Sequence, residues 1–115
     1  MEFYGYKKCS TCRNAYQYLK TLGVETEFQD FVETPPSVDT LRTWVEKHQQ
    51  GVQPFINTKG TRYRELGLKD QSLSDEEWLK MLSQDGKLIK RPIVVSGERV
   101  IVGFDKPAYD ALIAE

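Results

Sequence analysis

Two cysteines three positions apart, Cys9 and Cys12, follow a short aromatic segment at the amino terminus, and they are the two cysteines of the chain. Residues 2–6 are rich in aromatic side chains and predict a first strand. Ser10 can cap a helix that begins immediately afterwards. The cysteine pair is therefore expected where a strand passes into a helix, and this position restricts the fold to classes that begin with a strand and a helix.

The first helix is expected to end near Leu22, with Gly23 as its stop. Its buried face is predicted by a stripe at helical spacing, formed by Cys12, Ala15, Leu19 and Leu22. This stripe turns Cys12 toward the core and leaves Cys9, which precedes the helix, facing solvent. Residues 24–32 alternate loosely and predict a second strand, parallel to the first, so that the first three elements form a βαβ unit.

The middle of the chain carries helical patterns. Helices are predicted over residues 38–50, 62–66 and 74–84. The first of them follows Pro35-Pro36-Ser37, which breaks the preceding strand. The last begins with Ser74 and Glu77, which predict a capping box, and it is expected to stop at Gly86.

Two short apolar segments, residues 93–95 and 99–102, are joined by a glycine-containing link that predicts an antiparallel hairpin. Asp105 then caps a last helix. With the helical middle removed, the order βαβ–ββα is that of a thioredoxin fold. We therefore expect an α/β, thioredoxin/glutaredoxin-like fold in a single domain over residues 1–115, with a helical insertion subdomain at about 35–88.

Composition excludes several classes of function. The net charge of −1 gives no strong field toward nucleic acid or an anionic membrane. No apolar run approaches the roughly 20 residues that span a bilayer, and the start lacks the basic head of a signal peptide. We therefore expect a cytoplasmic monomer that binds neither nucleic acid directly nor a membrane. In that compartment a permanent structural disulfide is unusual, so a CxxC pair points to catalysis, redox sensing or metal binding.

Cys9 is the candidate nucleophile, because the start of a helix and nearby cations stabilise a thiolate. The cations close to it in sequence are Lys7, Lys8 and Arg13. Cys12 is the candidate resolving thiol, which can displace an adduct from Cys9 and close an intramolecular disulfide. Two other interpretations stay open at this point: a pair of inert buried thiols, and half of a zinc site, which would need two more ligands in a chain with one histidine.

Arg91-Pro92, directly before the hairpin, is the second candidate feature. In thioredoxin-like folds a cis-proline at the start of this strand faces the active cysteine. Arg91 would then point at the same place and could stabilise a thiolate or bind an oxyanion. The alternative is an ordinary turn proline beside a solvated arginine.

Other conspicuous residues have simpler interpretations. His48 is expected to be satisfied by a backbone carbonyl or water at a helix end, without a catalytic role. Trp44 and Trp78 are predicted to pack in the core. A loose basic cluster is interpreted as solvated surface, with an anion or thiol-cofactor site as the alternative; it consists of Lys59, Arg62, Arg64 and Lys69.

The sequence resembles the arsenate reductase (ArsC)/Spx family of glutaredoxin-like proteins, in its CxxC branch. The resemblance rests first on Cys9 together with the block Arg91-Pro92-Ile93-Val94-Val95, and it extends over essentially the whole chain. Further segments that carry it are Tyr4-Gly5, Cys12-Arg13, Pro35-Pro36-Ser37, Asn57-Thr58-Lys59-Gly60, Tyr63-Arg64-Glu65-Leu66-Gly67-Leu68 and Val102-Gly103-Phe104. The resemblance implies a thioredoxin fold with a helical insertion, an active thiol at Cys9 and an active-site arginine at Arg91.

The sequence departs from part of this family's pattern. Glutaredoxin-coupled arsenate reductases use one cysteine and three arginines around the oxyanion, and of those arginines Arg91 is matched here. Asn57 stands at the position of the loop arginine, and Gly103-Phe104 stands where that group has Cys-Arg. Because charge-assisted bonds anchor the oxyanion, the two missing cations weaken the expectation of efficient arsenate binding.

The preferred hypothesis is a thiol-dependent oxidoreductase resembling arsenate reductase, with a redox-active site of Cys9, Cys12, Arg91 and Pro92. Glutathione, glutaredoxin or a thioredoxin-type protein would recycle it, and no metal or tightly bound organic cofactor is expected. The alternative is an Spx-like regulator that binds the RNA polymerase α-subunit and uses the CxxC pair as an oxidation switch. Gly51 falls where Spx has a glycine for polymerase contact, whereas the Spx tail is not expected beyond Glu115.

Overall fold

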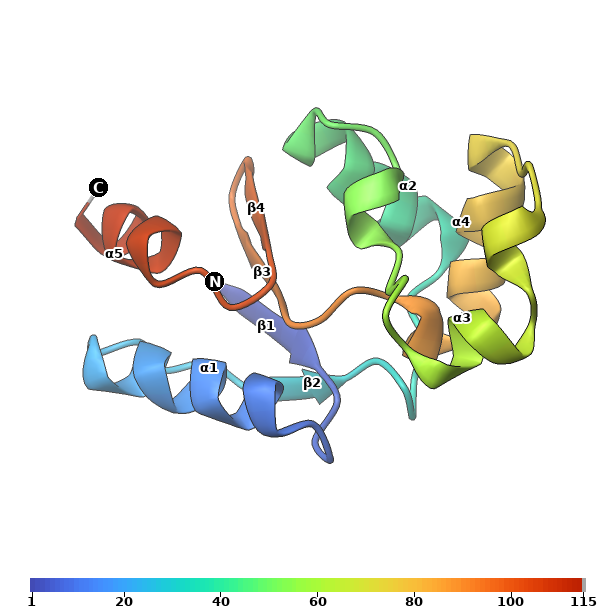
Figure 1. The fold of residues 1–115 in the computed structure, drawn as a ribbon. Coiled ribbons are helices and arrows are strands. Elements are labelled where there is room, and N and C mark those ends of the chain that lie inside the picture. Colours follow the sequence, from blue (N-terminus) through green and yellow to red (C-terminus); the bar gives the residue numbers. More distant parts are fainter. Residues whose placement is uncertain (115) are drawn as a thin grey trace.

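The computed structural model describes residues 1–114 and places four strands in one mixed sheet (Figure 1). The order across the sheet is β2–β1–β3–β4, with β1 at Glu2–Gly5, β2 at Phe28–Asp30, β3 at Ile93–Ser96 and β4 at Arg99–Val102. β1 pairs in parallel with β2 and antiparallel with β3, and β3 and β4 form an antiparallel hairpin. The predicted α/β, thioredoxin-like fold class is therefore confirmed.

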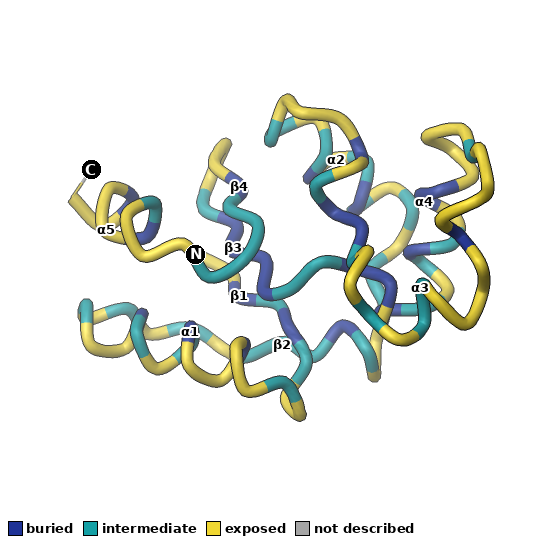
Figure 2. The backbone as a smooth tube through the Cα atoms, viewed as in Figure 1, coloured by how far each residue is buried: buried dark blue, intermediate teal, exposed yellow. Residues whose placement is uncertain are grey.

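Helices lie on both sides of the sheet (Figure 1). α1 (Ser10–Thr21) and α5 (Lys106–Ala114) pack with Phe3 and Val94 in one apolar cluster. Ile93 belongs to a second cluster, which it shares with the helices between β2 and β3. Successive strand residues point to opposite faces, so the central strands β1 and β3 contribute to both clusters. Figure 2 shows this burial as a dark stretch along β3 and on the inner sides of the helices.

The segment between β2 and β3 contains six helical elements: α2 (Val38–His48), η1 (Gln53–Phe55), α3 (Thr61–Glu65), η2 (Leu68–Asp70), α4 (Asp75–Gln84) and η3 (Gly86–Leu88), where η denotes a 3₁₀ helix. Trp44 and Trp78 are 3% and 4% exposed, which confirms their predicted place in the core. Among residues 1–114, no helix is both long and apolar enough to cross a membrane.

Two predicted helix caps are confirmed, at α4 and α5, and a cap that was not predicted begins α2. The Ser37 hydroxyl accepts the Thr40 N–H at 3.1 Å at the start of α2. Ser74 and Glu77 exchange two hydrogen bonds as a capping box at the start of α4. The Asp105 carboxylate accepts a backbone N–H at 3.1 Å in the first turn of α5. These are local interactions between residues a few positions apart, and the sequence contains everything they need.

The predicted cap of α1 at Ser10 is wrong, because the capping position belongs to Cys9. Cys9 has an extended backbone, with φ −93° and ψ 121°, while its carbonyl already accepts the Arg13 N–H at 3.1 Å. Ser10 is the first helical residue. Cys9 is therefore the N-cap residue, and its side chain lies at the amino-terminal end of α1.

One further boundary differs from the prediction. The second strand spans Phe28–Asp30 rather than residues 24–32, since the Asp30 carboxylate accepts the N–H groups of Val32 and Glu33 and turns the chain. The predicted end of α4 at Gln84 is confirmed. Asp85 caps that end, and Gly86 follows it as the first residue of η3.

Backbone contacts join the chain after η1 to the segment between η3 and β3. The Asn57 N–H donates to the Leu88 carbonyl at 2.8 Å, and the Lys90 N–H donates to the Phe55 carbonyl at 2.8 Å. Ile56 lies between these two bonds and forms an antiparallel β-bridge with Ile89. This ladder holds the loop that begins at Asn57 beside the residues that lead into β3.

Gly86 makes the closest contact between the insertion and the end of β2. A Cβ atom at position 86 would lie 1.9 Å from the Phe31 carbonyl oxygen and 2.9 Å from the Val32 Cα. Both neighbours are backbone atoms, so no side-chain rotation can relieve the overlap. Glycine is required here by the close approach of two chain segments.

Gly86→Ala should lower the free energy of unfolding by about 3 kcal/mol, because the added methyl group forces two backbones apart. Urea denaturation followed by circular dichroism measures the loss. Gln84→Ala, an exposed neighbour at the end of α4, is the control and should change stability by no more than about 0.5 kcal/mol. Equal stability of Gly86→Ala and the unaltered protein would contradict this close approach.

Candidate active site

The sheet register brings the two predicted site segments together. β1 and β3 are paired with Phe3 opposite Val94 and Tyr4 opposite Ile93. Continued by two residues, the same register sets Tyr6 opposite Arg91. Cys9 follows β1 at this edge of the sheet, so residues distant in sequence become neighbours.

Cys9 sits in a tight turn at the start of α1. Its N–H donates to the Tyr6 carbonyl at 2.9 Å, which fixes the backbone of the turn. Its side chain is half-buried, so the sulfur is partly accessible. The sulfur lies at the start of α1, where the N–H groups of the first turn are not used within the helix.

Cys12 lies one turn further along α1 and is completely buried. Its sulfur accepts the Tyr6 N–H at 3.5 Å. A Cβ atom on Gly5 would come within 3.0 Å of this sulfur, so the close packing of Cys12 against β1 requires glycine there. Both thiols are free in this structure.

The two thiols hold their protons with different strength. Burial alone would raise the pKa of Cys9, but hydrogen bonding from the Cys12 backbone and side chain, together with the Arg91 guanidinium, outweighs it and lowers that pKa. Burial raises the pKa of Cys12 to about 12, and the neighbouring Cys9 adds to the increase. The pair therefore favours a thiolate on Cys9 and a proton on Cys12.

Arg91 presents an uncompensated positive charge to this pair. Its Nη1 atom is buried and makes no hydrogen bond within residues 1–114. Its guanidinium carbon lies 5.2 Å from the centre of the Tyr6 ring. The Arg91–Pro92 peptide bond is cis, as expected for this position, and Pro92 is buried.

A hollow of about 400 Å³ opens beside Cys9. Lys59, Lys90 and Arg91 border it, and among residues 1–114 no acidic side chain does. Asn57 also lines the hollow, and its Nδ2 donates to the Lys87 carbonyl at 3.4 Å. The hollow is thus suited to an anionic group next to a reactive sulfur.

One expectation about charge needs correction. The cation that lowers the pKa of Cys9 is Arg91, whereas the Arg13 guanidinium donates to the Lys7 carbonyl at 2.9 Å.

The loose basic cluster is largely solvated surface, as interpreted from the sequence, because Lys59, Arg64 and Lys69 are exposed. Arg62 pairs with Asp85 at 2.6 Å, and of the four residues Lys59 borders the hollow.

Two other predicted positions also have defined surroundings. The buried Nδ1 of His48 has no hydrogen-bond partner among residues 1–114, and the ring packs edge-on against Phe55. Gly103 donates its N–H to the Pro92 carbonyl at 2.7 Å and does not border the hollow. The sequence analysis does not identify Lys90 or Tyr6 as site residues. No local sequence motif marks either of them, because their place at the site depends on contacts between distant segments.

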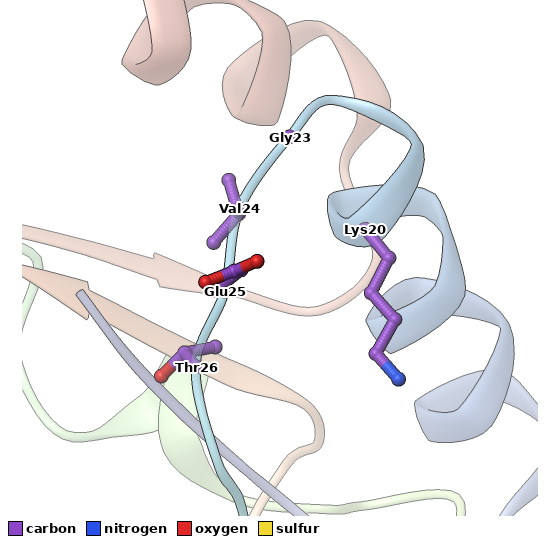
Figure 3. A pocket seen from close by; sticks show the side chains of 5 residues that line it. All are labelled: Lys20, Gly23, Val24, Glu25 and Thr26. Atoms are coloured by element: carbon purple, nitrogen blue, oxygen red, sulfur yellow. The ribbon is translucent and has the colours of Figure 1, made fainter.

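A second hollow, of about 450 Å³, lies at the far end of α1 (Figure 3). Lys20 projects from the helix, and Val24, Glu25 and Thr26 lie on the chain segment that follows. No cysteine borders this hollow among the described residues.

Residues 1–114 hold no group of three His, Cys, Asp or Glu side chains placed to bind a metal ion.

The arrangement around Cys9 supports nucleophilic attack by a thiolate. One sulfur is reachable and inclined to ionise, its partner is buried and keeps a proton, and a guanidinium lies beside both. Attack by the thiolate on a sulfur or another electrophile, with the cations binding its anionic part, is the chemistry such a site can perform.

Comparison with known proteins gives a consistent result. A family model described as "ArsC family" matches residues 4–112. The chain is 41% identical over 112 residues to the uncharacterised protein YusI of Bacillus subtilis, covering 96% of this chain and 95% of that protein. It is also 36% identical over 88 residues to an arsenate reductase of Rhizobium meliloti, covering 76% of this chain and 63% of the relative. A match at 24% identity, over 85% of this chain and 74% of the relative, is the global transcriptional regulator Spx of Lactiplantibacillus plantarum.

Solved structures agree with the fold. An ArsC-family-related protein from Bacteroides fragilis superimposes with a TM-score of 0.91 at 34% identity, covering 96% of this chain and 95% of the other. A protein from Streptococcus mutans described as a possible arsenate reductase gives a TM-score of 0.85 at 39% identity, with the same coverage of 96% and 95%.

Arg91→Gln should raise the pKa of the Cys9 thiol by about one pH unit, because the thiolate loses its neighbouring cation. Alkylation by iodoacetamide as a function of pH, with the product located by mass spectrometry, measures this pKa. Arg13→Gln is the matched control and should leave it unchanged, since Arg13 is bonded to a backbone carbonyl. A Cys9 pKa near 8.5 in the unaltered protein would contradict the described electrostatics.

Proposed function

Because the chain belongs to the ArsC family and a half-buried thiol with lowered pKa lies beside a buried protonated thiol, we propose that it is a thiol–disulfide oxidoreductase. The observation that carries the proposal is this division of protonation between Cys9 and Cys12. Inert structural cysteines have no need of one ionised, accessible sulfur. The same division is what an attacking and a resolving thiol require.

The reaction proceeds in two exchange steps. The Cys9 thiolate attacks one sulfur of a disulfide, a new sulfur–sulfur bond forms, and the second half of the substrate leaves as a thiolate that takes up a proton. Cys12 then gives up its proton and attacks the Cys9 sulfur, so that the Cys9–Cys12 disulfide forms and the first half leaves. Two electrons pass from the cysteine pair to the substrate, and two thiol groups of a reductant restore the pair.

The surrounding residues have separate roles in this scheme. Arg91 stabilises the Cys9 thiolate before attack and again when Cys9 becomes the leaving group for the reductant. Lys59 and Lys90 bind the anionic part of the substrate, because they border the same hollow. Pro92 does not line the hollow, and its role is to hold the chain next to Arg91, where its carbonyl accepts the Gly103 N–H.

Arsenate is a weaker candidate substrate than a disulfide that carries carboxylates. Asn57 has no charge, and Gly103 lies outside the hollow, so one guanidinium, that of Arg91, is left for the oxyanion there. Lysines add charge but lack the planar fork that binds a tetrahedral oxyanion at two points. Glutathione, glutaredoxin or a thioredoxin-type protein in the cytoplasm would act as the reductant, with the chain working as a monomer and without a bound cofactor.

Cys9→Ser should abolish reduction of a peptide–glutathione mixed disulfide, because the attacking sulfur is lost. The assay follows NADPH consumption with thioredoxin and its reductase, and separately with glutathione and its reductase. Without any reductant, Cys12→Ser should accumulate a glutathione adduct on Cys9, seen as a mass increase, because no thiol is left to release it. Arsenate added to the same assay should not accelerate thiol consumption.

Retained activity in Cys9→Ser would remove this cysteine from its role. Failure of Cys12→Ser to trap any adduct would leave Cys12 outside the reaction. Ser10→Ala, which alters an exposed hydroxyl next to the nucleophile, serves as the control and should retain activity.

A redox-responsive regulator is the second candidate function, and the matches to Spx proteins favour it. In this scheme closure of the Cys9–Cys12 disulfide changes binding to the α-subunit of RNA polymerase instead of completing a catalytic cycle. In a pull-down with the carboxy-terminal domain of the polymerase α-subunit, the oxidised and the reduced chain should then bind to different extents. The chain should also show no turnover of disulfides. Turnover without binding supports the oxidoreductase.

A further inference from the structure

Tyr6 is in contact with both cysteines and with Arg91. Its carbonyl accepts the Cys9 N–H at 2.9 Å, and its N–H donates to the Cys12 sulfur at 3.5 Å. Its ring lies 5.2 Å from the Arg91 guanidinium carbon. The backbone of one residue therefore holds both cysteines while its side chain meets the cation.

The contact between Tyr6 and Arg91 follows from the sheet. The register that pairs Tyr4 with Ile93 sets these two residues opposite each other where the ladder ends. Both residues lie beyond the last paired positions of β1 and β3, and their side chains are in contact there. Opposite positions on antiparallel strands bring side chains within reach of direct contact.

Arg91 has no carboxylate partner that would orient it. Its Nη1 atom is buried without a hydrogen bond, and within residues 1–114 no carboxylate forms an ion pair with it. A carboxylate in that place would fix the guanidinium but cancel most of its charge. An aromatic face attracts a guanidinium and orients it without contributing a formal negative charge, so the positive charge remains available to the sulfur.

We propose that Tyr6 is a positioning residue for Arg91. The ring of Tyr6 holds the Arg91 guanidinium next to the Cys9 sulfur. The ring acts through Arg91 and does not itself touch the reacting atoms. The inference rests on the proposed role of Cys9 as the nucleophile. It extends that role by naming the residue that keeps the activating cation in place.

The ring is separable from the backbone contacts of the same residue. A substitution at position 6 leaves the carbonyl that holds Cys9 and the N–H that meets Cys12, and it changes the contact with Arg91. The ring also lies 5.9 Å from the Lys87 ammonium, so a test has to show that the effect passes through Arg91. The contact uses the face of the ring and not the hydroxyl group, and phenylalanine should therefore substitute for tyrosine.

The experiment measures the pKa of the Cys9 thiol by the pH dependence of iodoacetamide alkylation in the unaltered protein and its variants. Tyr6→Leu should raise that pKa by about 0.5 pH unit and slow alkylation below the pKa roughly threefold, the size expected for a lost cation–π contact. Tyr6→Phe should restore the value of the unaltered protein. Tyr6→Leu combined with Arg91→Met should give the same pKa as Arg91→Met alone.

Two outcomes overturn the inference: an unchanged pKa in Tyr6→Leu, or the same increase whether or not Arg91 is present. Either would leave the proposed oxidoreductase function intact as long as Arg91→Met itself raises the pKa. An ordinary pKa for Cys9 in the unaltered protein would instead count against the proposed function. Tyr6→Gln is a second variant of this half-buried position, with urea denaturation as the check that each variant is folded.

Discussion

The antiparallel pairing of β1 with β3 is the contact on which the site depends. It sets the carboxyl end of one strand beside the amino end of the other, and it fixes their register residue by residue. The cysteines follow the first end, and Arg91 precedes the second. A register shifted by one residue would exchange the two faces of the shifted strand, so that side chains packed in one apolar cluster would meet the other. The core that holds the sheet therefore also holds the site residues in place.

The chemical difference between the two cysteines arises from their depth in the fold. They belong to the same helix start, but Cys12 lies on the stripe that packs against β1, whereas Cys9 precedes the helix. Burial makes ionisation of Cys12 costly, and its retained proton stabilises the negative charge on Cys9. One sulfur thus becomes reactive partly because its neighbour is prevented from ionising, and the charge of Arg91 acts in the same direction.

Sequence patterns predicted the parts of this structure that depend on near neighbours. The capping box at Ser74, the hairpin and the buried position of Cys12 all arise from residues a few places apart, and each was expected. The predicted length of the second strand was wrong, because the Asp30 carboxylate turns the chain and no apolar pattern records that. The rest of the site depends on contacts between distant segments, which periodicity does not contain. The thioredoxin-like order and the family resemblance both predict Arg91 near Cys9, and an anion site is the alternative interpretation of the cluster that contains Lys59. Nothing in the sequence predicts that Lys59 and Lys90 border one hollow beside Cys9.

The loop that begins at Asn57 belongs to the inserted helices, while the sulfur pair belongs to the sheet and α1. The Asn57 N–H fastens the start of this loop to the Leu88 carbonyl, and Lys59, further along it, is an exposed side chain at the hollow. A substitution at position 59 would therefore change the charge beside the sulfur without disturbing the sheet or α1, so the surroundings of the cysteine pair and the pair itself can evolve separately.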